Sequence, residues 1–182
     1  MKKAILFTTI LFSICIGANQ TLIAQTTKAT TTLSKEEQKV MDYIDANMPR
    51  AIALLKESVD INSGTLNIEG VKKVGAIFAR EFEKANFKTK WVPMPDSLRR
   101  AGHLVASIGF NADQNAAASS KTKTKKGKKL FLIGHLDTVF EPDMPANPFT
   151  MLNDSTATGQ GVTDMKGGDV VMIIALQALQ AQ

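Results

Sequence analysis

Cysteine is almost absent from this chain of 182 residues, and the single one, Cys15, lies in an apolar stretch near the N-terminus. If that stretch is removed from the mature protein, the remaining chain has no thiol. Disulfides, thiolate zinc ligands and cysteine nucleophiles are then excluded from this region. Histidine and carboxylate side chains are left as the ligands that could hold a metal.

Aromatic residues make up only 6% of the chain, and none interrupts the basic run 121–129, which holds six lysines. A basic run can bind nucleic acid or an anionic surface. Recognition of single strands, however, also uses aromatic side chains on which bases stack. We therefore expect no nucleic-acid partner. Residues 111–127, rich in Ala, Ser, Asn and Lys, are predicted to form a solvated loop between two strands, with a binding patch as the alternative.

The net charge of +5 comes from two short segments. Residues 1–24 contain two lysines and no acid, so the chain without them carries +3. Leaving out the six lysines of 121–129 as well gives −3. The composition of the full chain, with 44% hydrophobic and 21% charged residues, is that of a soluble globular protein. The length suits one domain.

The one long apolar run, 4–18, follows Lys2 and Lys3. At about 15 residues it fits a signal peptide and is shorter than the roughly 20 residues of a membrane-spanning helix. We expect export to the periplasm or the medium, cleavage after Ala18 or Ala24, and no stable membrane association afterwards. An uncleaved N-terminal anchor is the alternative. The predicted organisation is a signal peptide at 1–24, a Thr-rich linker at 25–33 and a catalytic-domain portion at 34–182.

Local patterns predict several helices and strands. Ser34 to Glu37 form a capping-box pattern that begins a helix, and a second helical stretch is expected from Pro49 to about Val59. Apolar residues recur at spacings of three and four over 69–85 and predict an amphipathic helix. Strands are expected over 87–92 and 103–110, and a mostly irregular, proline-containing segment over 140–158.

A short apolar run, 130–133, precedes a histidine and an aspartate and predicts a strand buried on both faces. Gly134 ends this run and lets the backbone pass close to its neighbours. In extended backbone His135 and Asp137 point to one side and Leu136 to the other. A neutral imidazole binds zinc well when a partner orients its second nitrogen. Asp137 is placed to be that partner or to lie beside the metal's water. In the alternative interpretation His135 only ends a strand and Asp137 only begins a turn.

A second motif places Asp164 between two pairs of glycines. Gly159 and Gly161 allow a tight loop, and Gly167 begins a helix that runs through Val170, Ile174 and Leu179. A carboxylate in such a loop can offer one oxygen to each of two metals about 3.5–4 Å apart. An aspartate that merely caps the helix is the alternative. A phosphate-binding loop is disfavoured, because the third glycine of its motif is missing and no Gly-Lys-Ser/Thr occurs.

Together, 134–139 and 159–168 resemble the two metal-site motifs of the di-zinc metallopeptidase family that includes glutamate carboxypeptidase, peptidase T, aminoacylase and the desuccinylases. The resemblance implies two zinc ions, with cobalt or manganese as alternatives. It implies that His135 binds one metal, that Asp164 bridges both, and that Asp137 is a catalytic residue that orients His135. The segments 62–71 and 103–106 are similar to the family's early loop and second strand, with His103 where the family more often has Asn. We expect His103 to be structural rather than a ligand.

The fold that this resemblance implies is α/β, a helix-flanked sheet of a zinc-exopeptidase-like catalytic domain that is truncated here. The implied activity is metal-dependent hydrolysis of an amide or peptide bond in a small peptide or N-acyl amino acid, as in glutamate carboxypeptidase. The family's Glu-Glu pair, its remaining ligands and a domain through which a homodimer could form are expected beyond Gln182, so the 182 residues alone are expected to be inactive. An exported, non-catalytic binding protein with the same fold is the alternative. Lys166 could contact substrate or stay solvated.

Overall fold

The computed structural model describes residues 32–109 and 130–182. The predicted signal peptide at 1–24, nearly all of the predicted linker and the predicted loop at 111–127 lie outside the described residues. In the part of the chain that the structure describes, no helix is long and apolar enough to cross a membrane. The helices and strands are α1 (Lys35–Val59), α2 (Ile68–Lys84), β1 (Lys88–Val92), β2 (His103–Ser107), β3 (Thr150–Asn153), β4 (Thr156–Thr158) and α3 (Gly167–Gln180).

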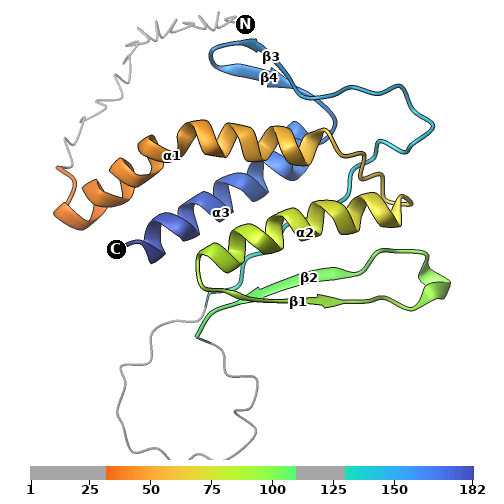
Figure 1. Cartoon of the computed structure of the whole chain (residues 1–182), viewed down its shortest axis with the longest axis horizontal. Helices are drawn as coiled ribbons and strands as arrows, with labels where there is room; N and C mark the ends of the chain where they lie inside the picture. Colours follow the sequence, from red (N-terminus) through yellow and green to blue (C-terminus); the bar gives the residue numbers. More distant parts are fainter. Residues whose placement is uncertain (1–31, 110–129) are drawn as a thin grey trace, which may run out of the picture. The chain divides into compact units, whose positions relative to one another are not determined.

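Three helices share the apolar core (Figure 1). Each helix contributes a stripe of buried aliphatic or aromatic residues, and these residues recur at helical spacing in the sequence. Leu136, from the segment that follows the described gap, packs against the same core. The core residues are Ala51 and Leu54 of α1, Val74, Ile77 and Phe78 of α2, and Val170, Ile173 and Ile174 of α3.

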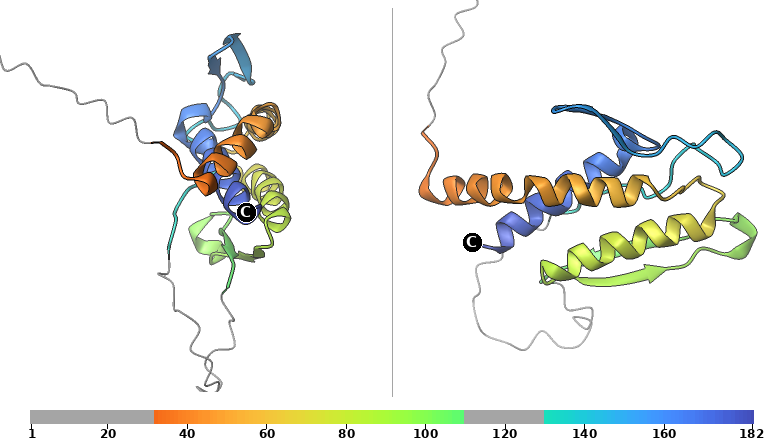
Figure 2. Two further views of the ribbon diagram at one scale, coloured as in Figure 1. Left: turned by 90° about the vertical axis from the view of Figure 1, so that its left-hand side faces the viewer. Right: turned by 45° about the horizontal axis from the view of Figure 1, so that its top comes forward.

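Helix α2 covers a two-stranded hairpin, as Figures 1 and 2 both show. Strands β1 and β2 pair antiparallel, with Lys88 opposite Ser107 and Val92 opposite His103. The indole Nε1 of Trp91 donates to the carbonyl of Ala101 at 2.9 Å. The described part is therefore a mixed helix-and-sheet structure, compatible with the predicted α/β class. The sheets in it are two small antiparallel hairpins, β1–β2 and β3–β4.

Helix α1 is continuous, where the sequence predicted two helices separated before Pro49. Proline lacks an N–H and usually ends or kinks a helix. Here Ile44 on one side of it and Leu54 on the other both pack against the core, so tertiary packing holds the helix together through the proline. The predicted capping box is confirmed, because the Glu37 N–H donates to Ser34 Oγ at 3.2 Å and the Ser34 N–H to Glu37 Oε2 at 2.7 Å.

The predicted buried strand at 130–133 is wrong for the described structure. This segment forms no strand, and Leu130, Phe131 and Ile133 are 78%, 84% and 76% exposed. An apolar run becomes a buried strand only where neighbouring strands and helices cover it. Among the described residues β1 pairs with β2 and β3 with β4, and none of them pairs with this run. The one ladder contact nearby is a parallel bridge between Gly64 and Thr138.

The segment 140–158 contains a hairpin that the sequence analysis did not predict. Strands β3 and β4 pair antiparallel across a turn at 154–155. The side chain of Asn153 stabilises this turn, because its Oδ1 accepts from the Ser155 N–H at 2.9 Å. An Asn-Asp-Ser sequence between two short runs is a turn signal. The prolines that precede it obscured that signal.

Candidate metal centre

Three segments that are far apart in sequence meet at the candidate centre. They are the loop 61–67 between α1 and α2, the segment 134–141, and the turn 162–166 before α3. The N–H of Thr138 donates to the carbonyl of Ser63 at 2.8 Å, and the N–H of Thr65 donates back to the carbonyl of Thr138 at 3.0 Å. These two bonds fix the first segment against the second.

The two residues that the sequence predicted as metal ligands are brought together. His135 Nε2 lies 2.9 Å from Asp164 Oδ1, although 29 positions separate the residues. The Asp164 side chain is 79% exposed and that of His135 43% exposed. The pair therefore lies at the surface, where solvent and small solutes can reach both groups.

Both ring nitrogens of His135 face oxygen atoms. Nδ1 lies 3.0 Å from the main-chain carbonyl oxygen of Asp137, so an Nδ1–H donates to it. Burial lowers the pKa of the imidazole, but the Asp137 carbonyl and the Asp164 and Asp137 carboxylates outweigh it and raise the pKa above its ordinary value of 6.5. In the absence of metal the ring therefore holds a proton more tightly than a free histidine does.

Asp137 contacts His135 mainly through its main chain. Its carboxylate Oδ1 is 3.5 Å from His135 Nδ1, which is longer than a normal N–H···O hydrogen bond. Its other oxygen, Oδ2, accepts from the Thr65 hydroxyl at 2.6 Å. The predicted period-two arrangement is present: His135 and Asp137 lie together, while Leu136 packs against the core.

Asp164 is held in a turn and does not cap α3. The residue that precedes α3 is Lys166, and in the described chain no side chain caps that helix end. Gly161 begins the turn with φ of 83°, a left-handed conformation that favours glycine. The peptide bond between Asp164 and Met165 is cis. The structure therefore argues against the alternative in which Asp164 is only a helix cap.

Lys166 is fully buried, which differs from both alternatives that the sequence left open. Its Nζ donates to the carbonyls of Ser58 at 2.9 Å and Ile61 at 3.0 Å, at the C-terminal end of α1. Burial lowers the pKa of this ammonium to about 8, although the Asp60 carboxylate acts in the opposite direction. Lys166 thus ties the turn that carries Asp164 to the end of α1.

Asp169 is a buried carboxylate beside the centre that the sequence analysis did not identify. It is 3% exposed, and its Oδ2 has no hydrogen-bond partner within the described residues. Burial raises its pKa to about 7, against the effect of the nearby His135. A Cβ at Gly134 would lie 2.2 Å from Asp169 Oδ1, so the predicted close approach at Gly134 is confirmed. In the sequence Asp169 looks like an ordinary acid in the first turn of a helix, so no local pattern marks it.

The donor set at the centre fits a zinc ligand pair. An imidazole nitrogen and a carboxylate oxygen are both common zinc ligands, and here they face each other at an exposed position. No group of three or more His, Cys, Asp or Glu side chains that could hold a metal occurs in residues 32–109 and 130–182. His103 is exposed at the start of β2, opposite Val92, and takes no part in the centre.

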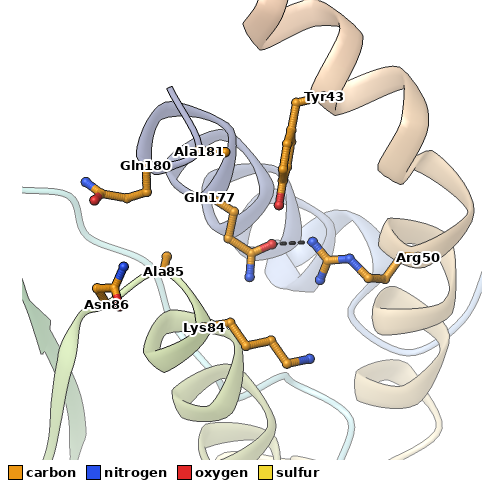
Figure 3. Close-up of a pocket in the computed structure, with 8 residues that line it drawn as sticks. All are labelled: Tyr43, Arg50, Lys84, Ala85, Asn86, Gln177, Gln180 and Ala181. Carbon is orange, nitrogen blue, oxygen red and sulfur yellow. Dashed lines mark hydrogen bonds between the residues drawn. The ribbon is translucent and has the colours of Figure 1, made fainter.

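A pocket elsewhere, lined by the middle of α1 and the C-terminal ends of α2 and α3, does not belong to this centre (Figure 3). Two cations line it, but both are already paired: Arg50 Nη1 and Lys84 Nζ bond to the buried carboxylate of Glu81 at 2.8 and 2.7 Å. Arg50 also bonds to the Gln177 side chain, as Figure 3 shows. We therefore interpret these ion pairs and hydrogen bonds as structural contacts that hold the three helices together.

Comparison with known proteins shows a distant relationship. No protein-family model matches the chain. The chain is 27% identical over 147 residues to carboxypeptidase G2 of Pseudomonas sp. strain RS-16. The matched region is 80% of this chain and 32% of that protein, so the chain spans about a third of the relative's length. The similarity is thus to one part of a protein named as a carboxypeptidase.

Proposed function

We propose that this chain carries part of the zinc site of an exported hydrolase that cleaves an amide or peptide bond in a small peptide or N-acyl amino acid. The observation that carries the proposal is the 2.9 Å approach of His135 Nε2 to Asp164 Oδ1. Two motifs that were each ambiguous in the sequence bring together, at one exposed point, a nitrogen and an oxygen that could bind a metal. The distant similarity to a carboxypeptidase supports the same reaction class.

The chain's own residues supply binding and orientation in this proposal. Neutral His135 offers Nε2 as a ligand while its Nδ1–H donates to the Asp137 carbonyl, an arrangement that favours the required tautomer. Asp164 offers a carboxylate whose 79% exposure leaves its second oxygen free for a second metal. When bound, a metal pair polarises a carbonyl and lowers the pKa of water.

The substrate class is proposed from the relative and from the sequence resemblance. The relative is named a carboxypeptidase, an activity that acts at the C-terminal end of a substrate. A substrate with a free carboxylate, such as a dipeptide with C-terminal glutamate or an N-acyl amino acid, is the corresponding choice here.

The metal site is tested by zinc titration of this chain, followed by NMR of the imidazole resonances. The chain has two histidines, so His103 serves as an internal reference for His135. We expect zinc to shift the His135 resonances with weak affinity and to leave those of His103 in place. His135→Ala and Asp164→Ala should remove specific binding, and His103→Ala should not. Zinc binding that is unchanged in Asp164→Ala, or no shift at His135, would refute the site.

The reaction is tested on the longest polypeptide that the gene encodes, with a C-terminal glutamyl dipeptide and an N-acyl amino acid as substrates. Zinc-dependent release of the C-terminal residue, lost in His135→Ala and retained in His103→Ala, is the expected result. Zinc binding without turnover of either substrate would favour the non-catalytic binding protein instead.

A further inference from the structure

Thr65 makes two hydrogen bonds to the segment that carries His135 and Asp137. Its main-chain N–H donates to the carbonyl of Thr138 at 3.0 Å. Its hydroxyl lies 2.6 Å from Asp137 Oδ2 and 3.2 Å from the Thr138 carbonyl. One hydroxyl proton serves one acceptor at a time, and the shorter bond to the charged oxygen is the stronger. The Thr65 hydroxyl therefore donates its hydrogen bond to the Asp137 carboxylate.

This hydroxyl determines where the rest of the Asp137 carboxylate lies. With Oδ2 held by Thr65, Oδ1 stays 3.5 Å from His135 Nδ1, on the same side of the ring as the Asp137 carbonyl. Asp137 is 35% exposed, so water would otherwise compete for it and let the side chain rotate. A negative charge held beside Nδ1 stabilises the Nδ1–H tautomer and leaves Nε2 free to bind a metal.

We propose that Thr65 is a positioning residue for the metal centre, which acts by holding the Asp137 carboxylate beside His135. The proposal deepens the zinc site put forward above and rests on it for its functional meaning. The loop that carries Thr65 reaches the centre from the junction of α1 and α2, 72 positions before Asp137. In this proposal Thr65 contacts neither His135 Nε2 nor Asp164 Oδ1. Its effect on the centre is transmitted through Asp137 alone.

The test compares variants that differ in one hydroxyl. Thr65→Val keeps the side-chain shape and removes the donor, whereas Thr65→Ser keeps the donor. Thr150→Val is the matched control, because the Thr150 hydroxyl donates to the Pro148 carbonyl on the exposed strand β3. Zinc titration followed by the His135 resonances should show an affinity about tenfold weaker in Thr65→Val, a typical loss for an outer partner of a ligand. Thr65→Ser and Thr150→Val should keep the wild-type affinity.

A measurement on zinc-free protein tests the role of Thr65 independently of the proposed zinc site. The imidazole ¹⁵N shifts of zinc-free protein, at a pH where His135 is neutral, report its tautomer. In Thr65→Val the population should move from Nδ1–H toward Nε2–H, which Asp164 favours, while His103 stays unchanged. A tautomer population unchanged in Thr65→Val, or shifted equally in Thr65→Ser, overturns the role of Thr65. Absence of any zinc effect in the wild type would instead refute the metal site, and the tautomer would still decide the role of Thr65.

A double-mutant cycle checks that Thr65 acts through Asp137. If it does, Thr65→Val should cause no further change in tautomer or zinc affinity when Asp137 is already Ala. Additive effects of the two substitutions would show that Thr65 acts by another route and would overturn the proposal.

Discussion

The imidazole of His135 and the carboxylate of Asp164 form a direct pair, with Nε2 and Oδ1 2.9 Å apart. When His135 is protonated, a proton lies between these two atoms. Zinc would bind the same Nε2 only after that proton leaves. The second nitrogen faces the Asp137 carbonyl at 3.0 Å. Proton and metal therefore compete for one position, and this competition gives the centre a defined dependence on pH.

Zinc affinity should rise with pH through the pKa of His135. That pKa is raised above 6.5, because the acceptors at both nitrogens outweigh the effect of burial. Below this pKa, each decrease of one pH unit should weaken zinc binding about tenfold, since one proton must leave before the metal binds. The zinc dissociation constant, measured from about pH 5.5 to about pH 8.5, tests this. His103→Ala should give the same profile, and an affinity that does not change with pH would contradict the competition.

The same pair has an effect of opposite sign on the stability of the zinc-free protein. A histidine whose pKa is raised on folding stabilises the fold below the unfolded pKa, and this contribution is lost as pH rises through the folded pKa. Zinc should reverse the trend, because it stabilises the folded state most where His135 is neutral. Unfolding curves with and without zinc should coincide at low pH and diverge as pH rises through the pKa of His135.

The two aspartates of the centre should differ in their effect on metal binding. Asp164→Ala removes a ligand and should abolish the zinc response of His135. Asp137→Ala keeps the main-chain carbonyl that accepts from Nδ1, so zinc should still bind, about 10–100-fold more weakly. Zinc titration of both variants, with Asp154→Ala in the β3–β4 turn as control, measures the difference. If Asp137→Ala lost all binding while Asp164→Ala kept it, the two roles would have to be exchanged.

Features set by neighbouring residues could be predicted from the sequence. The capping box at Ser34 and the amphipathic stripe of α2 depend on contacts within one helix or on one helical face, and both are present. The common orientation of His135 and Asp137 follows from extended backbone in the same way. The meeting of His135 with Asp164 was expected from family motifs and not from any local pattern.

Features that depend on distant segments could not be predicted. The run 130–133 has the composition of a buried strand, but burial requires partner strands that the described residues do not provide. Lys166 looks like a surface lysine in the sequence and becomes buried only because Ile61, 105 positions away and just after α1, offers it a carbonyl. The bond from Thr65 to Asp137 has the same origin, since 72 positions separate its partners.

Because of Lys166, the free energy of unfolding should increase as the pH becomes alkaline. Its pKa is lowered by burial from 10.5 to about 8, so between these values the unfolded chain binds a proton that the folded chain does not. The free energy of unfolding therefore increases with pH over this window, by about 2–3 kcal/mol between about pH 8 and about pH 10. Lys166→Met should remove this increase, and Lys73→Met, at an exposed position of α2, should keep it. Urea unfolding at both pH values measures the effect, and parallel pH profiles for wild type and Lys166→Met would show that Lys166 is charged throughout.

Asp169 should have the opposite effect in the acidic range. Burial raises its pKa from 3.8 to about 7, so between these values the folded protein holds a proton that the unfolded chain has released. Stability therefore falls as pH rises from about 4 to about 7. Asp169→Asn is neutral at every pH and has a similar shape, so it should match the wild type near pH 4 and exceed its stability by about 2–4 kcal/mol above about pH 7.

Urea unfolding of zinc-free protein measures this difference, with Asp154→Asn in the exposed β3–β4 turn as the control that should follow the wild type. A constant difference between Asp169→Asn and wild type from about pH 4 to about pH 8 would mean that Asp169 is ionised in the folded protein at all these values. Its Oδ2, which lacks a partner within the described residues, would then have to be bonded to a donor such as an ordered water. The pH dependence of a single substitution thus decides whether a neutral acid or an anion lies behind Gly134, next to the histidine proposed to bind zinc.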